Sequence, residues 1–171
     1  ATPTISGNIS LTVPTTTYPN SVEHAGNTGG NNGKLDALDD RLFEAMIRNG
    51  RLWTAHNLRV STTGVANTAA LSPNASRWDE IQSLSTTPTL VQSGTVFDNV
   101  ATRAAAQQYF IPSIAVTGQG HAVIGFTGAG VIGATPAYTG RLASDPLGSM
   151  NGSPGTGVTT FGTSTSNYNP P

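Results

Sequence analysis

The dipeptide Asn49-Gly50 constrains this chain more than any other short feature, because it lies between two runs of strand-forming residues. Asn-Gly is the strongest short-range signal for a β-hairpin, since both residues tolerate the positive φ angles of a two-residue turn. Residues 42–48 and 51–60 are therefore predicted to pair as antiparallel strands.

Similar apolar runs, separated by Gly, Pro and Ser, continue along the chain and predict an all-β fold. A second hairpin is predicted around Gly118-Gln119-Gly120, and alternating apolar residues predict an N-terminal strand at 8–13. Short helical turns are predicted at 35–42, from the spacing of its leucines, and at 101–108. The other predicted strands are 77–84, 89–97, 109–117, 121–127, 138–143 and 159–164.

The composition excludes several classes of protein. The chain has 171 residues, no cysteine, a single lysine (Lys34), 10% charged residues and a formal net charge of −1. It therefore has no basic surface for nucleic acid or an anionic membrane, and no apolar run approaches the ~20 residues that span a bilayer. The lack of cysteine excludes disulfides, thiolate metal sites and cysteine catalysis.

The remaining composition indicates where the chain works and what it contacts. A sequence rich in Thr, Ser, Gly and Asn that begins at Ala1 is typical of a mature secreted bacterial protein, in the extracellular space or the periplasm. Its few charges favour neutral, hydrogen-bonding ligands over ionic ones.

The two hairpins align at an offset of 70 residues, which indicates an internal repeat. The turn glycines Gly50 and Gly120 coincide, and Trp53 falls on Val123. Each repeat unit holds about four strands, the content of one propeller blade. The chain accordingly divides into an extended lead with an Asn/Gly-rich loop (1–40), a first blade-like unit (41–100) and a second blade-like unit (101–171).

Residues 112–126, PSIAVTGQGHAVIGF, resemble a hairpin of sialidase-like and related bacterial β-propellers. Residues 39–57 resemble uncharacterised secreted bacterial proteins that carry the same repeats. The resemblance covers 30–148 and the closing 168–171, and implies propeller-like blades of four antiparallel strands. Sialidase chemistry is not implied, because the chain has no Ser-x-Asp-x-Gly-x-Thr-Trp box and no recognisable arginine triad.

Two blades do not close a ring, since propellers need about four or more. We therefore expect the chain to be a fragment of a longer propeller, or to close as a homo-oligomer. A β-sandwich is the alternative fold.

Four of the nine carboxylates, Asp36, Asp39, Asp40 and Glu44, lie together after the Asn/Gly-rich loop. Carboxylate and amide oxygens on a flexible loop suit Ca²⁺. The candidate metal ligands are Asn31, Asp36, Asp39 and Asp40. Their spacing does not match an EF-hand loop, and the alternative is a solvated acidic segment whose aspartates pair with neighbouring arginines.

A glycoside hydrolase needs two carboxyl groups ~5–9.5 Å apart across the sugar. Asp79 and Glu80 cannot form that pair together, because adjacent strand residues point to opposite faces. The alternative is that the carboxylates lie on the surface without a catalytic role and that the histidine, His56, is a buried core residue. The candidate catalytic residues are Asp39, Asp40 or Glu44 with Asp79 or Glu80, and His56 as a general base.

Trp53 and Trp78 are candidate ligand-binding residues, because an indole ring can stack on a sugar; the alternative places both in the core. Three functions stay open. The first is a secreted binding or structural module that contacts extracellular glycans or proteins, and the second is a glycoside hydrolase. The third is a self-assembling surface or filament protein that recruits copies through unpaired sheet edges.

Overall fold

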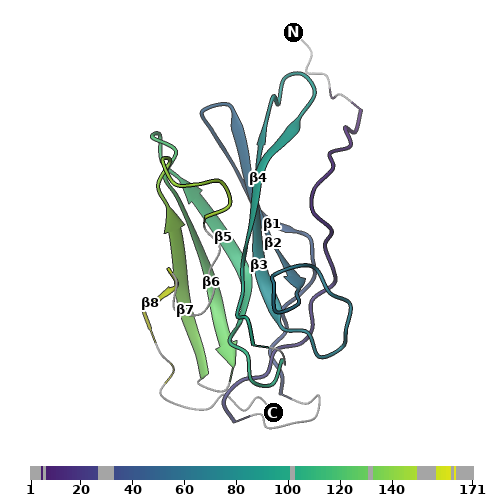
Figure 1. Ribbon diagram of the computed structural model, residues 1–171, viewed down its shortest axis with the longest axis vertical. Coiled ribbons are helices and arrows are strands. Elements are labelled where there is room, and N and C mark those ends of the chain that lie inside the picture. Colours follow the sequence, from purple (N-terminus) through teal and green to yellow (C-terminus); the bar gives the residue numbers. More distant parts are fainter. Residues whose placement is uncertain are drawn as a thin grey trace.

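The computed structural model describes residues 5, 7–26, 33–100, 103–130, 133–149, 157–162 and 164. This part of the chain contains two four-stranded antiparallel sheets and no helix (Figure 1). The prediction of an all-β fold is confirmed. No described helix is long and apolar enough to cross a membrane.

Both sheets are meanders, in which each strand pairs with the next strand of the chain. The first sheet contains β1 (Leu42–Arg48), β2 (Arg51–Arg59), β3 (Asn74–Gln82) and β4 (Thr89–Val96). The second contains β5 (Gln108–Val116), β6 (Ala122–Gly130), β7 (Gly133–Arg141) and β8 (Thr159–Thr160). Every strand predicted after residue 41 overlaps an observed one, although β7 begins five residues earlier than predicted.

The β1–β2 hairpin closes through the predicted turn. Asn49 and Gly50 have φ angles of 53° and 71°, and Arg48 pairs with Arg51 on either side. Two positive φ angles are required by a type I′ turn, which matches the right-handed twist of the paired strands.

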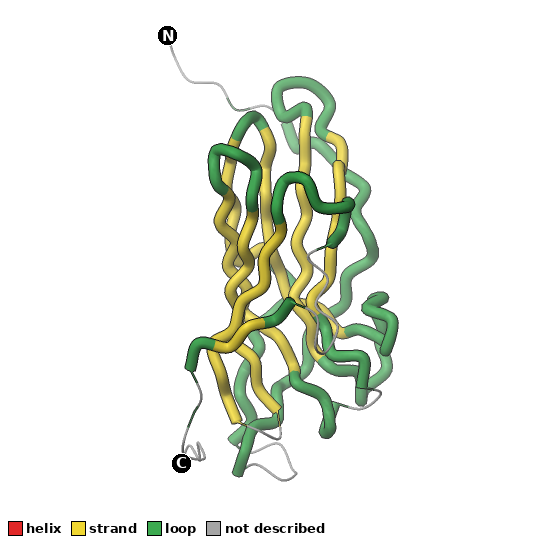
Figure 2. The backbone as a smooth tube through the Cα atoms, turned by 60° about the vertical axis from the view of Figure 1, so that its left-hand side comes forward, coloured by secondary structure: helices red, strands yellow, loops and turns green. Residues whose placement is uncertain are grey.

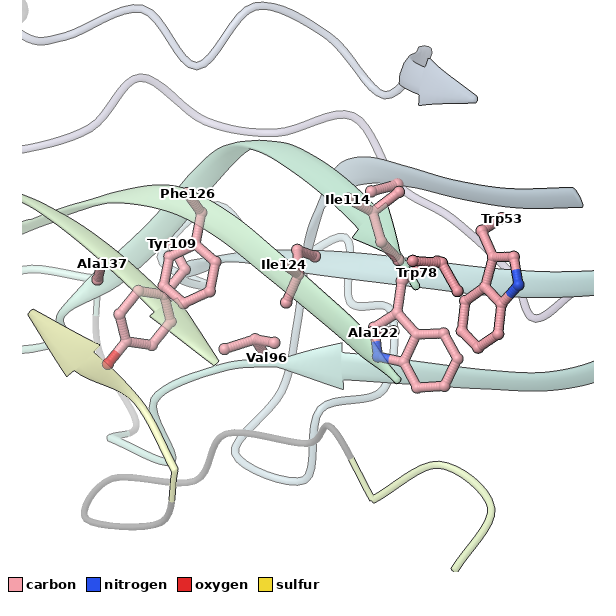
Figure 3. Close-up of a cluster of buried hydrophobic side chains, with 11 residues drawn as sticks. Trp53, Trp78, Val96, Tyr109, Ile114, Ala122, Ile124, Phe126 and Ala137 are labelled. Atoms are coloured by element: carbon pink, nitrogen blue, oxygen red, sulfur yellow. The ribbon is translucent and has the colours of Figure 1, made fainter. Parts of the chain in front are cut away.

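The two sheets pack face to face, and the main core lies between their inner faces (Figure 2). Figure 3 shows two aromatic pairs toward opposite ends of this core. The rings of Trp53 and Trp78 stack with centroids 5.6 Å apart, and Tyr109 meets Phe126 edge-on at 4.9 Å. Such rings bury large apolar areas, so they hold the two sheets together.

The N-terminal lead runs along the outer face of the first sheet, which points away from the second sheet (Figure 1). The Thr17 hydroxyl donates to the Arg59 carbonyl at 2.9 Å, and Arg77 Nη1 donates to the Thr15 carbonyl at 2.7 Å. The strand predicted at 8–13 is wrong: these residues join no sheet, and the lead attaches through single side-chain bonds.

The helical turn predicted at 35–42 is also wrong. Leu35 pairs with Val22 in an isolated β-bridge, and Leu42 begins β1. Leu38 has a φ of 63° and is 49% exposed, so the leucines form no common buried stripe. Of the second predicted helical turn, 101–108, the described residues form turns that lead into β5.

The alignment of the two hairpins at an offset of 70 residues holds for their first strands, β1 and β5. It fails for their second strands, β2 and β6. Met46 and Val116 both face the core, as the offset predicts. Trp53 and Val123 do not correspond: Trp53 is buried, whereas Val123 is 40% exposed on the outer face. Trp53 pairs with Met46 and Ala122 pairs with Val116, so the second hairpin is one residue shorter. A one-residue shift exchanges the two faces of a strand.

Candidate functional site

A cleft of about 300 Å³ lies between the hairpin ends of the two sheets. We call it the hairpin-end cleft. Figure 1 shows these hairpin ends at the top of the molecule. The cleft is lined by Arg48, Asn49, Arg51, Trp53, Glu80, Val91, Gln92, Val116, Gly120, Arg141, Ala143, Asp145 and Leu147. Its lining therefore draws on both sheets and on the loop that follows β7.

Two hydrogen bonds join the hairpin tips beside this cleft. Asn49 Nδ2 donates to the Gly118 carbonyl at 2.7 Å, and Arg48 Nε donates to the Val116 carbonyl at 3.3 Å. The first bond depends on the type I′ turn, which positions the Asn49 side chain beside the tip of the second hairpin. The tips are thus held in a defined relation to one another.

Arg141, the last residue of β7, is a buried arginine at the cleft. It is 6% exposed, and its guanidinium carbon lies 5.8 Å from the ring centroid of Trp78. Nη2 donates to the Asp145 carbonyl at 2.9 Å. Nε and Nη1 have no hydrogen-bond partner among the described residues. Such donors are costly to bury, so they mark the place where a further acceptor is needed.

The acidic groups of the cleft already have partners. Glu80 accepts from Arg51 Nη1 at 2.9 Å and from Gln92 Nε2 at 2.5 Å. Asp145 Oδ2 accepts from the Leu142 amide at 2.7 Å. The Gly148 amide in turn donates to Gln92 Oε1 at 2.8 Å, so the loop after β7 is attached to the first sheet.

A second polar cluster, His56, Arg77 and Asp79, is buried on the outer face of the first sheet. His56 Nδ1 lies 4.0 Å from Asp79 Oδ2, and Arg77 Nε donates to Thr95 Oγ1 at 3.0 Å. Burial, and next the charge of Arg77, lower the pKa of His56 from 6.5 to about 4, against an opposing effect of Asp40. Burial raises the pKa of Asp79, against the opposing effects of Ser93 and Arg77.

This buried cluster brings two candidate catalytic residues, His56 and Asp79, together. Neither His56 nor Asp79 lines the hairpin-end cleft or the smaller cleft of about 200 Å³ beside Arg77. Neither cleft therefore gives a substrate access to them. Glu80 lies on the opposite face of β3, as expected for neighbours on a strand. The arrangement can hold a neutral imidazole inside the protein, and its unpartnered ring nitrogens and Asp79 Oδ1 suit ordered water.

The other candidate carboxylates, Asp39, Asp40 and Glu44, do not line the hairpin-end cleft, although the charge of Asp40 acts on His56. Glu44 accepts a hydrogen bond from the Ser113 hydroxyl between the two sheets. Asp39 pairs with Arg41 at 2.5 Å, and the hydrogen bond from that arginine lowers the pKa of Asp39. Neither of the two clefts described above brings Asp39, Asp40 or Glu44 together with Asp79 or Glu80.

The candidate Ca²⁺ ligands form no recognisable cage. Asp36 Oδ1 accepts from the Leu38 amide at 2.7 Å, and Asp39 is engaged by Arg41. Asn31 lies outside the described residues. In the ranges that the structure covers, no three His, Asp or Glu side chains are grouped to hold a metal ion.

The two tryptophans lie in the core rather than on the surface. Trp78 is fully buried and Trp53 is 3% exposed. Trp53 still contributes to the wall of the hairpin-end cleft, whereas Trp78 lies beneath Arg141. Neither ring offers an open face on which a sugar can stack.

Sequence reasoning did not find the arginines of the cleft. Arg48 and Arg51 flank the Asn49-Gly50 turn and pair across it, but Arg141 is 90 residues away in the sequence, so no local motif connects it to them. One signal was present: Arg141 is the only Lys, Arg, Asp or Glu between Arg103 and Asp145. A lone charge in a long uncharged stretch of strands marks a position worth testing.

Comparison of the chain with protein family models, curated proteins and solved structures found no significant match.

Proposed function

We propose that this chain is part of a secreted, propeller-like binding module that takes an extracellular glycan in the hairpin-end cleft. The observation that carries the proposal is the cleft itself, at the junction of two sheets and lined by arginines, amides and the edge of a tryptophan. Ligand sites are commonly concave, with a few convergent polar groups on an apolar frame.

The sheet arrangement supports the propeller-like part of the proposal. Both sheets are four-stranded meanders in chain order, and they pack face to face with hairpin ends side by side. Consecutive blades of a propeller have this relation. A two-layer sandwich has it as well, so the blade assignment draws additionally on the resemblance of residues 112–126 to bacterial propeller hairpins.

The binding proposal is tested by nuclear magnetic resonance titration of the whole chain with neutral and acidic oligosaccharides. We expect saturable shifts of the backbone amides of Asn49, Gly120 and Leu147, which line the cleft. The amides of Leu71 and Thr17, which lie outside it, should stay unchanged. If no oligosaccharide shifts the cleft amides, or if the shifts gather on the outer faces, the proposal fails.

Self-association is a second candidate function, and one observation favours it. Strands β5, β6 and β7 carry no Lys, Arg, Asp or Glu apart from the inward-facing Arg141. The outer face of the second sheet exposes Val123 and Tyr138 at about 40% each, with Phe161 beside Tyr138. A sheet face without charged side chains lacks the charges by which proteins discourage association with further copies.

Sedimentation velocity at micromolar concentration tests this second candidate. A dimer that Val123→Glu dissociates would support association through the outer face of the second sheet. A compact monomer at all concentrations would reject it and leave the binding proposal untouched.

A further inference from the structure

The hairpin-end cleft contains a buried cation that no carboxylate neutralises. Arg141 is 6% exposed, yet no ion pair links its guanidinium to any described carboxylate. Its Nε and Nη1 lack acceptors, and its Nη2 bonds to a neutral main-chain carbonyl. A buried charge is strongly unfavourable unless an opposite charge or several hydrogen bonds compensate it.

Neither carboxylate of the cleft lining, Glu80 or Asp145, forms an ion pair with Arg141. Glu80 is shared between Arg51 and Gln92, and Asp145 Oδ2 is held by the Leu142 amide. Arg48 adds a further positive charge from the β1–β2 hairpin end. Three of the chain's eight Lys and Arg side chains thus line one cleft with two engaged carboxylates.

The guanidinium of Arg141 is also fixed in position. It lies over the Trp78 ring, and its Nη2 bond to the Asp145 carbonyl holds the loop after β7. The Gly148–Gln92 bond attaches the far end of that loop to β4. A group that is ordered before the ligand arrives loses little conformational freedom on binding.

We propose that the hairpin-end cleft binds an anionic group, a carboxylate or a sulfate ester of an acidic glycan, with Arg141 as the residue whose charge it neutralises. This inference rests on the proposed function, because it names the class of glycan for the same cleft. Charge-assisted hydrogen bonds from arginine to an oxyanion are shorter and stronger than neutral ones. The neutral ligand favoured by the overall composition would leave Arg141 uncompensated.

Isothermal titration calorimetry of the whole chain against three probes tests the proposal. The probes are oligogalacturonate, which carries carboxylates, sulfated dextran, which carries sulfate esters, and neutral maltohexaose. We expect at least one acidic probe to bind saturably and the neutral probe to bind at least about tenfold more weakly. The stronger of the two acidic probes identifies the source of the anion. Affinity should fall as NaCl is raised, because salt screens the attraction.

Two substitutions locate the binding. Arg141→Gln should weaken the acidic probe by about a hundredfold, a loss typical of removing a charged partner from a buried pair. Arg41→Gln is the matched control, because Arg41 is an exposed arginine paired with Asp39 away from the cleft. It should bind as the unaltered chain does.

A third substitution avoids the risk that a buried change prevents folding. Leu147 lines the cleft and is 72% exposed, so Leu147→Glu places a competing carboxylate there without disturbing the core. It should weaken the acidic probe by about tenfold or more. Leu71→Glu, at a 65% exposed leucine outside the cleft, is its control and should have no effect.

The outcomes separate this inference from the proposed function. Equal binding of maltohexaose and the acidic probes, with shifts at the cleft, would overturn the anionic inference and leave the glycan-binding proposal in place. Binding of no probe would overturn both. Acidic binding that Arg141→Gln and Leu147→Glu leave unchanged would show a diffuse surface attraction and overturn the assignment to this cleft.

Discussion

The two sheets share strand order and direction, but they differ in the number and location of their charged residues. The first sheet buries titratable groups on both faces: His56, Arg77 and Asp79 outside, and Glu80 inside. The second sheet has one charged residue in its three long strands, Arg141, and its outer face is uncharged and exposes Val123 and Tyr138.

This difference indicates how each outer face is completed. The N-terminal lead covers part of the first sheet's outer face and donates or accepts hydrogen bonds at Thr15 and Thr17. On the second sheet the lead covers one end of the outer face, where Val22, Leu35 and Ala37 pack against Phe110, Ala129 and Ala134, while Val123 and Tyr138 stay exposed. The main core between the inner faces is apolar, and the charged side chains that line the cleft lie at the hairpin ends of the sheets.

The largest expected effect comes from the shared core. Trp78→Ala should lower the free energy of unfolding by about 3–5 kcal/mol, because it removes a fully buried indole and leaves a cavity. Tyr138→Ala, on the open face of the second sheet, should cost less than about 1 kcal/mol. Urea denaturation of both variants measures the contrast, and equal losses would show that the second sheet's outer face is buried in solution.

The second prediction concerns the buried histidine of the first sheet. The folded protein keeps His56 neutral down to a pKa of about 4, whereas the unfolded chain takes up a proton near pH 6.5. The unfolding free energy should therefore fall as pH is lowered through this window, by about 3 kcal/mol in total. The raised pKa of Asp79 acts oppositely at the acidic end, because folding then favours its protonated form.

Urea denaturation at pH 7 and pH 4.5 measures this dependence. His56→Gln should flatten it, whereas His121→Gln, in the turn before β6, should leave it in place. The assignment to His56 would be contradicted if His56→Gln lost as much stability between the two pH values as the unaltered chain.

The third prediction compares two strand glycines. A Cβ at Gly94 would lie 2.4 Å from Trp78 Nε1, so Gly94→Ala should cost about 1–3 kcal/mol through overpacking. A Cβ at Gly125 on the second sheet's outer face would meet its nearest atom at 4.0 Å, so Gly125→Ala should be close to neutral. Thermal unfolding distinguishes the two, and similar melting temperatures would show that the Trp78 ring does not lie over Gly94 as described.

The smallest effect is expected at the bond between the hairpin tips. Asn49→Gly keeps the positive φ of the turn but removes the donor to the Gly118 carbonyl. An exposed hydrogen bond contributes about 0.5–1.5 kcal/mol, so the loss should fall in that range. Hydrogen exchange of the Gly118 and Gly120 amides should rise with it, and unchanged exchange would mean that the tips move independently.

Much of the fold follows from local signals in the sequence. The Asn49-Gly50 turn fixes one hairpin, and alternation of apolar residues marks the strands around it. The false strand at 8–13 shows the limit of that signal, since alternation does not provide a partner strand. The leucines at 35–42 fit a helical period by coincidence, and the chain there is bridged to Val22 instead.

The candidate site was harder to predict, because its residues meet only through the packing of two sheets. The sequence indicated carboxylates and tryptophans, which carry familiar chemistry. The structure instead gathers Arg48, Arg51 and Arg141, whose common location depends on the one-residue difference between the hairpins and on the loop after β7. Neither feature is visible in a local pattern.

Tryptophan fluorescence tests the central claim, that the hairpin-end cleft is the binding site, most directly. The chain has two tryptophans: Trp53 lines the cleft and Trp78 lies beneath Arg141. Titration with oligogalacturonate or sulfated dextran should change their emission saturably, with a midpoint that matches calorimetry, and Arg141→Gln should abolish the change. Saturable binding by calorimetry with unchanged emission, or the same emission change in Arg141→Gln, would contradict the claim.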